Sequence, residues 1–435
     1  MLILFKLLGS LALLMFGMKS MSDALQKMAG PQLRHVLGAM TTNRFTGVLT
    51  GMFVTAAVQS STATTLMTVS FVNAGLLTLL QAISVIMGAH IGTTVTAWLM
   101  SLTDVFNVTN LIYPAFFIGI ILIYMKKQRI VGDFLFGIAF LFLGLSTLKE
   151  TGFSLVDDPE TSVVISNFFA NFNEPNFWNS FFFLFMGTVL TLCVQSSAAI
   201  MAITMTLCST GVLHIDQGIM LVLGENIGTT ITANIVAMGA NTQARRAALA
   251  HFTINVIGVT WALLLLQPFV NLVCAFVGFD RGVTPGDANY AANLAKISIV
   301  LATFHSAFNI SNTLLQIWFI KYIERFVCWI VKPKSADGDE EDFRLHFITS
   351  GIMKTPELSV LEAHKEIESF AERMQRMFGM VRELLTLSSS ATASKKDAQT
   401  GDFNKLYSRI EKYEGISDNM ELEIAKYLEQ VSDAH

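Results

Sequence analysis

Charged residues are scarce in this sequence. Asp, Glu, Lys and Arg together make up 14% of its 435 residues, whereas soluble domains usually carry about 25%. The mean hydropathy of +0.54 therefore excludes an ordinary soluble protein for most of the chain. The formal net charge is −4, so charge gives no reason to expect a nucleic-acid partner, and we predict none.

Cysteine is also rare. The four cysteines lie in or beside apolar runs, and their spacing fits neither a disulfide framework nor a metal site. We expect them to be inert packing residues. No paired Ser–His arrangement for nucleophilic catalysis is evident, so we do not expect an enzyme. The cysteines are Cys193, Cys208, Cys274 and Cys328.

Apolar stretches dominate the first three quarters of the chain. A helix that crosses a bilayer needs about 20 mainly apolar residues, and such stretches recur up to residue 332. We expect spans at about 82–101, 111–125 and 131–148. The apolar run at the N-terminus contains Lys19 and lacks a small-residue cleavage site, so we expect a retained first span rather than a signal peptide.

The sequence changes character near Lys332. We predict a transmembrane domain over 1–332, a linker over 333–355 that contains the charged run KSADGDEED, and a soluble helical region over 356–435. Apolar residues at helical spacing predict two amphipathic helices in this last region, at about 356–387 and 403–431. The polar stretch 388–402 between them is predicted to be a loop.

An internal repeat organises the transmembrane part. The segments 51–97 and 187–233 align without a gap at a constant shift, and about 19 of about 47 aligned pairs are identical. VQSS at 58–61 matches VQSS at 194–197, and IGTT at 91–94 matches IGTT at 227–230. A weaker similarity links LLMFGMKSM at 13–21 with FLFLGLSTL at 140–148. We place the first repeat at about 1–127 and the second at about 128–332.

Charge in the loops predicts the orientation of the two repeats. Basic residues concentrate on the cytoplasmic side of a membrane protein, and the basic loops here include KKQR at 126–129. The acidic stretch 149–176 suits the outside. Three spans separate the repeats, so the second repeat enters from the opposite face. The sequence therefore predicts inverted repeats, an arrangement found in many secondary transporters.

Each QSS motif interrupts an apolar stretch that is too short to span twice. Two half-helices that meet at the motif would form a re-entrant hairpin, because unwound backbone at membrane depth is tolerated where it lines a cavity. The second half-helix would offer unpaired N–H groups and the positive end of its dipole, which together bind anions such as phosphate. The predicted anion-binding residues are Gln59, Ser60, Ser61, Thr62, Gln195, Ser196, Ser197 and Ala198, the last through its backbone.

Carbonyls freed at the end of the first half-helix would suit Na⁺, which prefers oxygen ligands. Basic side chains are scarce in the apolar region, so a divalent anion would need helix ends and co-bound cations to neutralise it. Sodium coupling is therefore physically reasonable. The predicted sodium ligands are Gln59, Ser61, Thr93, Thr94, Gln195, Ser197, Asn226, Thr229 and Thr230.

Packing is the alternative interpretation of these residues, because small polar residues bring membrane helices close together. The presence of QSS at matching positions of both repeats favours a site. The roles of the other intramembrane polar residues stay open. Glu225 has Ala89 as its repeat partner, and His90 takes the place of Asn226. Two H-x-x-x-N pairs, His251 with Asn255 and His305 with Asn309, each put both side chains on one helix face and favour interhelical hydrogen bonds.

These motifs resemble the sodium/phosphate cotransporter family, whose repeats carry a QSSS-type motif and a G-x-N-I-G-T-T motif. Here they read VQSSTATT with GAHIGTT, and VQSSAAIM with GENIGTT. The resemblance covers about residues 2–330. It implies that the QSS hairpins form the sodium and phosphate site. Thr62 and Ala198 replace the third serine, and His90 replaces an asparagine. The segment from Glu357 is similar to the helical PhoU-like region of bacterial members, which implies a regulatory or oligomerising role.

We therefore expect an all-α polytopic protein of a bacterial cytoplasmic membrane, with its C-terminus in the cytoplasm, that transports inorganic phosphate with sodium as the co-transported ion. Two other functions stay open. One is a carrier for another small oxyanion or a dicarboxylate, and the other is a phosphate sensor that signals through its soluble tail. Whether the chain forms a homo-oligomer, and whether it imports or exports phosphate, is left open by the sequence.

Overall fold

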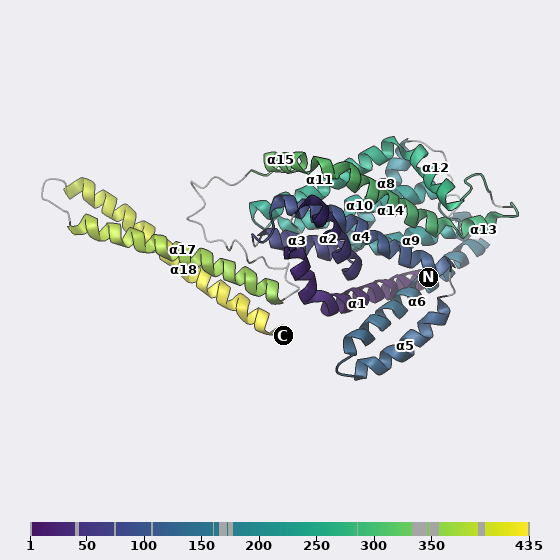
Figure 1. The fold of residues 1–435 in the computed structure, drawn as a ribbon, viewed down its shortest axis with the longest axis horizontal. Coiled ribbons are helices and arrows are strands. Elements are labelled where there is room, and N and C mark those ends of the chain that lie inside the picture. The colour runs from purple at the N-terminus through teal and green to yellow at the C-terminus, as the bar shows by residue number, and fades with distance from the viewer. Residues whose placement is uncertain are drawn as a thin grey trace.

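The structure is a computed structural model. It describes residues 2–39, 43–73, 75–105, 108–159, 161–164, 172, 177–284, 286–332, 345, 348, 356–389 and 396–433. Within these ranges every regular element is a helix. The predicted linker 333–355 lies almost wholly outside the described residues. Figure 1 shows a body of packed helices, from which a long two-helix hairpin projects.

The order of the helices matches the internal repeat of the sequence. Each QSS motif lies where one short helix ends and a second begins, with its last serine as the first residue of the second helix. Each IGTT motif lies within the helix that comes next. The first repeat contains α1 (Leu2–Ala39), α2 (Arg44–Val58), α3 (Ser61–Asn73), α4 (Leu79–Val105) and α5 (Thr109–Tyr124). The second contains α6 (Arg129–Asp157), α8 (Phe177–Val194), α9 (Ser197–Ser209), α10 (Ile215–Ala237), α11 (Thr242–Leu264), α12 (Leu266–Val277), α13 (Tyr290–Leu294), α14 (Ile297–Gln316), η1 (Ile317–Phe319) and α15 (Ile320–Ile330).

Within the described residues, five helical stretches are long and apolar enough to cross a membrane. The chain is therefore an all-α polytopic membrane protein. The predicted spans 82–101 and 131–148 lie inside two of them, while the third, 111–125, corresponds to the shorter helix α5. Large apolar side chains on the outer surface, such as Phe117 and Phe276, are exposed, as expected for a surface that faces lipid. The five stretches are Leu79–Thr103, Arg129–Asp157, Ile215–Ala237, Thr242–Leu264 and Tyr290–Ile330.

Helices α1 and α6 cross each other in a reciprocal way. A Cβ atom on Gly17 of α1 would lie 2.2 Å from the backbone nitrogen of Leu141, and one on Gly144 of α6 would lie 2.4 Å from that of Leu14. The weaker sequence similarity aligns Gly17 with Gly144 and Leu14 with Leu141. Equivalent residues therefore make equivalent contacts, as across a two-fold axis. The pairing also runs the two helices antiparallel.

Glycines also allow each hairpin to pack closely against the long helix that follows it. In the first repeat, a Cβ on Gly88 of α4 would lie 1.9 Å from the carbonyl oxygen of Val48 in α2. In the second, a Cβ on Gly224 of α10 would lie 2.0 Å from that of Leu184 in α8. No other residue could occupy these positions without moving a backbone. In both repeats, therefore, the first helix of the hairpin and the long helix approach each other closely at a glycine.

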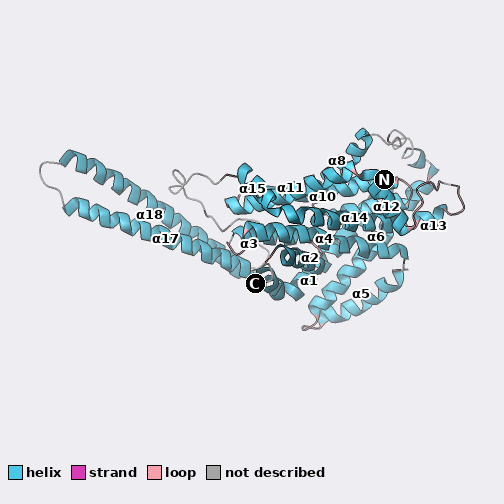
Figure 2. Cartoon of the chain, turned by 45° about the horizontal axis from the view of Figure 1, so that its top comes forward, coloured by secondary structure: helices cyan, strands magenta, loops and turns pink. Residues whose placement is uncertain are grey.

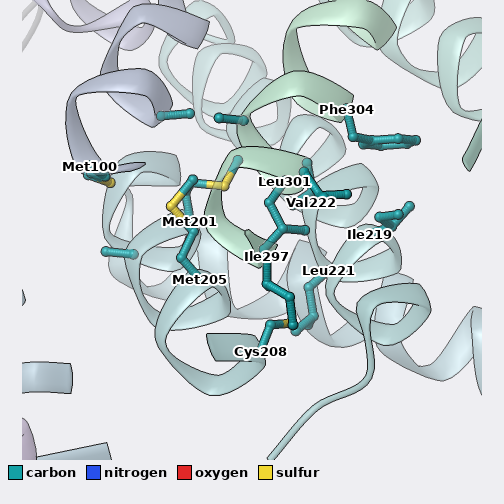
Figure 3. Close-up of a cluster of buried hydrophobic side chains, with 14 of the residues drawn as sticks. Met100, Met201, Met205, Cys208, Ile219, Leu221, Val222, Ile297, Leu301 and Phe304 are labelled. Atoms are coloured by element: carbon teal, nitrogen blue, oxygen red, sulfur yellow. The ribbon is translucent and has the colours of Figure 1, made fainter. Parts of the chain in front are cut away.

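A large apolar core lies mainly in the second repeat. Figure 3 shows Met201 and Met205 of α9, Ile219 and Val222 of α10, and Leu301 of α14 among its side chains. All five are almost fully buried. Helix α14 contacts both α4 and α10, so it joins the two repeats. The core thus holds the second hairpin against the helices that surround the first.

The region predicted to be soluble forms a helical hairpin of α17 (Pro356–Ser389) and α18 (Lys396–Asp433), as Figure 2 shows. Two helices were expected, but the predicted loop 388–402 was too long. Helix α18 begins at Lys396, because KDAQ at 396–399 is helical where polarity alone suggested a loop. The buried Glu362 carboxylate accepts a hydrogen bond of 2.9 Å from Tyr427 Oη, and burial raises the pKa of Glu362 to about 7.

Candidate ion-binding site

Both motif glutamines end a helix in the left-handed conformation. Gln59 follows α2 with φ 56°, and Gln195 follows α8 with φ 55°. They are the only residues other than glycine with positive φ in the described part of the chain. Such a conformation costs an L-residue about 1 kcal/mol or more. Matching strain at matching positions of a repeat points to a function for these two residues.

Each hairpin tip then starts a second helix with unpaired donors. Ser196 caps α9, and its Oγ accepts the N–H of Ala199 at 3.2 Å. Ser60 Oγ accepts the N–H of Ala63 in the same way. A serine Oγ that accepts here keeps its own O–H free to donate. The described contacts give no acceptor to the N–H groups that follow, those of Ser61, Thr62, Ser197 and Ala198.

The end of helix α2 supplies oxygen atoms at the first tip. Ser22 of α1 donates to the carbonyl of Val58 at 2.7 Å, so this side chain satisfies one of the carbonyls at the end of α2. Thr96 of α4 donates to Gln59 Oε1 at 3.0 Å, and Gln59 Nε2 donates back to the carbonyl of Ala56. The Gln59 side chain is therefore held in place on both sides. Its carbonyl oxygen can still accept or coordinate, because it has two lone pairs.

The threonines of IGTT, which are predicted sodium ligands, bond to backbone carbonyls of their own helices. Thr93 Oγ1 donates to the carbonyl of Ala89 at 2.9 Å, and Thr94 Oγ1 donates to that of Ile91 at 2.8 Å. Thr229 and Thr230 make the same bonds in the second repeat. Asn226 Nδ2 donates to a carbonyl of its own helix. The hydroxyl hydrogens are thus used within the helix, and the oxygens keep lone pairs for a positive ion.

The hairpin helices are short. Helices α2 and α3 have 15 and 13 residues, and α8 and α9 have 18 and 13. At about 1.5 Å per residue, 13 residues extend about 20 Å, well below the hydrocarbon thickness of about 30 Å. The structure places the helix breaks at the motifs, where the sequence predicts the tips of the hairpins.

The second helix of each hairpin contacts the IGTT helix of the other repeat. Helix α3 contacts α10 of the other repeat, and α9 contacts α4. Each helix start that is predicted to bind the anion therefore belongs to a helix that packs on the IGTT helix of the opposite repeat. The predicted anion ligands and sodium ligands lie on α3, α4, α9 and α10 or on the residues just before α3 and α9, so the fold gathers their helices into one assembly.

Two contacts at the first tip were not predicted. No sequence signal singled out Ser22, because it lies just beyond the weak similarity at 13–21. Thr96 carried a usable signal: it is identical to Thr232 in the aligned repeats and lies on the α4 face that reaches Gln59. Three buried histidines are also brought near one another, which the H-x-x-x-N spacing only partly anticipates.

Comparison with known proteins shows the family to which the chain belongs. The family model described as Na⁺/Pi-cotransporter matches residues 13–150 and 165–280, which is more than half of the chain. This protein belongs to the Na⁺/Pi-cotransporter family. The matched residues include both QSS motifs and both IGTT motifs, so the resemblance noted from these motifs is confirmed. Membership makes the chain a phosphate transporter by family.

Relatives agree with this placement. YjbB of Escherichia coli (strain K12), whose name assigns it to inorganic phosphate export, is 26% identical over 95% of this chain and 71% of its own length. YqeW of Bacillus subtilis (strain 168) is 27% identical over 77% of this chain and its full length. Sodium-dependent phosphate transport protein 2C of Homo sapiens is 36% identical over 21% of this chain and 16% of its own length. Among solved structures, none matches this chain.

Proposed function

We propose that this protein is a sodium-coupled carrier of inorganic phosphate, built from two inverted repeats whose re-entrant hairpins meet at a shared site. The observation that carries the proposal is the chemistry of the two tips. At each tip, helix N–H groups and serine hydroxyls that have no acceptor among the described contacts follow a helix end that presents carbonyl and amide oxygens. Donors of this kind suit an oxyanion, and such oxygens suit Na⁺.

The antiparallel crossing of α1 and α6 supports the inversion. These helices begin the two repeats and correspond in sequence at Gly17 and Gly144. If corresponding helices run in opposite directions, so do the repeats that they begin. The short hairpin helices support a re-entrant arrangement, because a 13-residue helix is too short to cross the hydrocarbon layer. Basic loops such as KKQR at 126–129 favour a cytoplasmic location for the soluble hairpin.

Sodium coupling follows from charge. Phosphate carries one to two negative charges near neutral pH, and the residues at the tips are all uncharged. Two helix dipoles supply only about half a positive charge each. Co-bound sodium would supply the rest, so sodium should tighten phosphate binding and phosphate should tighten sodium binding by the same factor.

Flux measurements in proteoliposomes test the proposal. The purified full chain is reconstituted, and uptake and release of ³²P-phosphate are followed with Na⁺, K⁺ or choline on the phosphate side. We expect flux that needs Na⁺, competition by arsenate, and little effect of succinate. Liposomes without protein give the background flux, and Gln195→Ala proteoliposomes should show reduced flux at low phosphate. Equal phosphate flux in Na⁺ and choline would overturn sodium coupling, and stronger inhibition by succinate than by arsenate would favour a dicarboxylate carrier.

The two flux directions are measured separately, since the E. coli relative is named for export. A carrier that couples phosphate to sodium moves both ions in the same direction, so reversing the sodium gradient should reverse net phosphate flow. If net phosphate flow does not depend on the direction of the sodium gradient, this chain shares the phosphate site of its family but not the coupling to sodium.

A further inference from the structure

Glu225 is a buried carboxylate that the proposed phosphate site does not use. Among the described residues of 2–332 it is the only buried Asp or Glu, with 1% of its surface exposed. Neither Oε1 nor Oε2 makes a hydrogen bond in the described structure. The residue lies on α10, directly before Asn226, and the aligned residue of the first repeat is Ala89. An ionisable side chain at such a depth calls for a partner.

Neither protonation state of Glu225 satisfies this position by itself. A carboxylate without a partner is costly in a low-dielectric interior. A neutral carboxyl group avoids that cost, but its O–H still needs an acceptor and its carbonyl oxygen still needs a donor. The described contacts supply neither. A bound cation would neutralise the carboxylate and coordinate its oxygens, which is one of the few ways in which a buried charge is stable.

Three helices meet on the face of α10 that carries Glu225. A Cβ atom on Gly218 would lie 2.5 Å from Cys208 Sγ and 3.5 Å from Thr204 Cγ2, both on α9. It would also lie 3.5 Å from a side-chain carbon of Leu301 on α14. Glu225 follows Gly218 by seven residues, which is almost two full turns, so the two residues lie on the same face. That face is therefore directed towards α9 and α14.

The hairpin of α9 and α10 places Glu225 along α9. The two helices pack on each other and are joined by residues 210–214, so they run antiparallel. Seven residues along α10 span about 10 Å. The corresponding step along α9 leads from Cys208 and Thr204 back towards Ser197, where α9 begins. Long helical side chains lean towards the N-terminal end of their own helix. The Glu225 carboxylate therefore lies between Thr204 and the second hairpin tip.

Thr204 brings a second unpaired oxygen to this interface. Its side chain is fully buried, and its Oγ1 makes no hydrogen bond in the described structure. Thr68, the aligned residue of the first repeat, donates instead to the Thr64 carbonyl at 2.7 Å. Apolar side chains such as Met201 and Leu301 surround this junction, as Figure 3 shows. The hydroxyl of Thr204 is thus available as a ligand beside the carboxylate.

We propose that Glu225 and Thr204 form a binding site for one sodium ion at the interface of α9 and α10, beside the second hairpin tip. Carboxylate and hydroxyl oxygens suit a hard cation. One carboxylate balances one monovalent charge, and the described residues contain no group of three or more His, Cys, Asp or Glu that could hold a metal ion. The first repeat has no counterpart of this site, because Ala89 takes the place of Glu225.

The site links sodium to phosphate through charge, a role that rests on the proposed function. While the site is empty, the Glu225 carboxylate places a negative charge near the N–H groups that begin α9, and this charge repels phosphate. A bound sodium ion cancels it and leaves the positive end of the helix dipole to the anion. Sodium should therefore bind before phosphate, and each ion should tighten the binding of the other.

Sodium binding is measured first, without phosphate. The purified full chain is titrated with ²²Na⁺ at constant ionic strength, with choline as the replacing cation. Glu225→Gln keeps the size of the side chain and removes its charge. Glu150→Gln is the matched control, because Glu150 is exposed on α6. We expect Glu225→Gln to bind one sodium ion fewer per chain, and Glu150→Gln to bind as many as wild type.

Two outcomes of this titration would overturn the site. One is equal sodium binding by wild type and Glu225→Gln, as expected for a carboxyl group that is protonated and only packs. The other is displacement of the ion by K⁺ as readily as by Na⁺, which would contradict a site for sodium.

Thr204→Val tests the same site without removing a charge. Valine keeps the shape of threonine but lacks the hydroxyl, so sodium affinity should fall about fivefold. Thr206→Val is the control, because Thr206 Oγ1 is also buried and unpaired but its side chain faces Gly152 of α6. Thermal unfolding in choline shows which variants are folded. If Glu225→Gln is not folded, Thr204→Val decides, and unchanged sodium affinity there would refute the site.

Phosphate binding at a series of sodium concentrations tests the coupling. The slope of log Kd for phosphate against log sodium concentration reports how many sodium ions are taken up with each phosphate. This slope should fall by about one in Glu225→Gln and stay unchanged in Glu150→Gln. An unchanged slope in Glu225→Gln would overturn the role in coupling.

The two measurements separate this site from the proposed function. If Glu225→Gln loses a sodium ion but wild-type phosphate binding needs no sodium, the site is supported and the sodium-coupled function is wrong. If phosphate binding needs sodium and Glu225→Gln alters neither the sodium count nor the slope, the function stands and the site at Glu225 is wrong.

Discussion

The two hairpin tips share a sequence and a backbone but differ in how far they are enclosed. At the first tip, Ser61 is buried, Gln59 is half buried and is held by Thr96, and Ser22 bonds the carbonyl of Val58. At the second tip, Gln195 is exposed, and no bond from Thr232 to its side chain is present among the described contacts.

The difference shows how a symmetric design can produce an asymmetric state. In a transporter made of inverted repeats, a closed conformation of one repeat and an open conformation of the other give access from one side. The same residues would then exchange environments when access switches. Four predictions test how far the two repeats are equivalent.

The largest effect is expected from the packing glycines. Gly88→Ala and Gly224→Ala each add a Cβ about 2 Å from a backbone oxygen of the adjoining hairpin helix. The helices must separate, which should cost about 3 kcal/mol. Both variants should lower the thermal unfolding temperature in detergent to a similar extent. Gly9→Ala, where a Cβ meets nothing within 4 Å, is the control. A large effect in one repeat alone would contradict the shared packing.

The motif glutamines come next. Gln59→Ala and Gln195→Ala should each reduce phosphate affinity about tenfold or more, because a ligand is lost and its neighbours stay unpaired. Gln→Gly at the same positions removes the amide but suits the positive φ. The glycine variants should therefore be as inactive as the alanine variants but more stable. Glycine variants with wild-type flux would show that only the backbone matters.

A smaller and unequal effect is expected from the aligned threonines. Thr96→Val removes the bond to Gln59, which is worth about 1 kcal/mol, or about fivefold in affinity. Thr232→Val should have less effect if the second tip stays open in the resting state. Sodium titrations of phosphate binding compare the two. Equal losses would indicate that the bond forms in both repeats during the cycle.

The smallest effect is expected where the motifs differ. Thr62→Ala makes the first tip resemble the second, and Ala198→Thr does the reverse. Both positions keep their backbone N–H, so phosphate affinity should change by only about twofold. Equilibrium phosphate binding to purified protein measures this change. Complete loss of binding in Thr62→Ala would instead assign this hydroxyl a direct role that Ala198 cannot share.

The sequence by itself determined the membrane class, the repeat and the position of both helix breaks. Apolar length dictates helices in a bilayer, because the backbone cannot leave hydrogen bonds unmade there. The paired VQSS and IGTT blocks placed the candidate site, since chance does not repeat polar residues at matching points of apolar segments. The two soluble helices were also predictable from their periodicity, although the start of α18 was not.

Only the tertiary structure decided which of these residues meet. The reciprocal contact of Gly17 and Gly144, the bond from Thr96 to Gln59 and the enclosure of one tip rather than the other depend on packing between distant segments. The same holds for His90, His251 and Asn255. Their spacing within a helix fixes a shared face, but the approach of α4 to α11 is set by side-chain packing across the whole body. Local sequence carries no record of that distance.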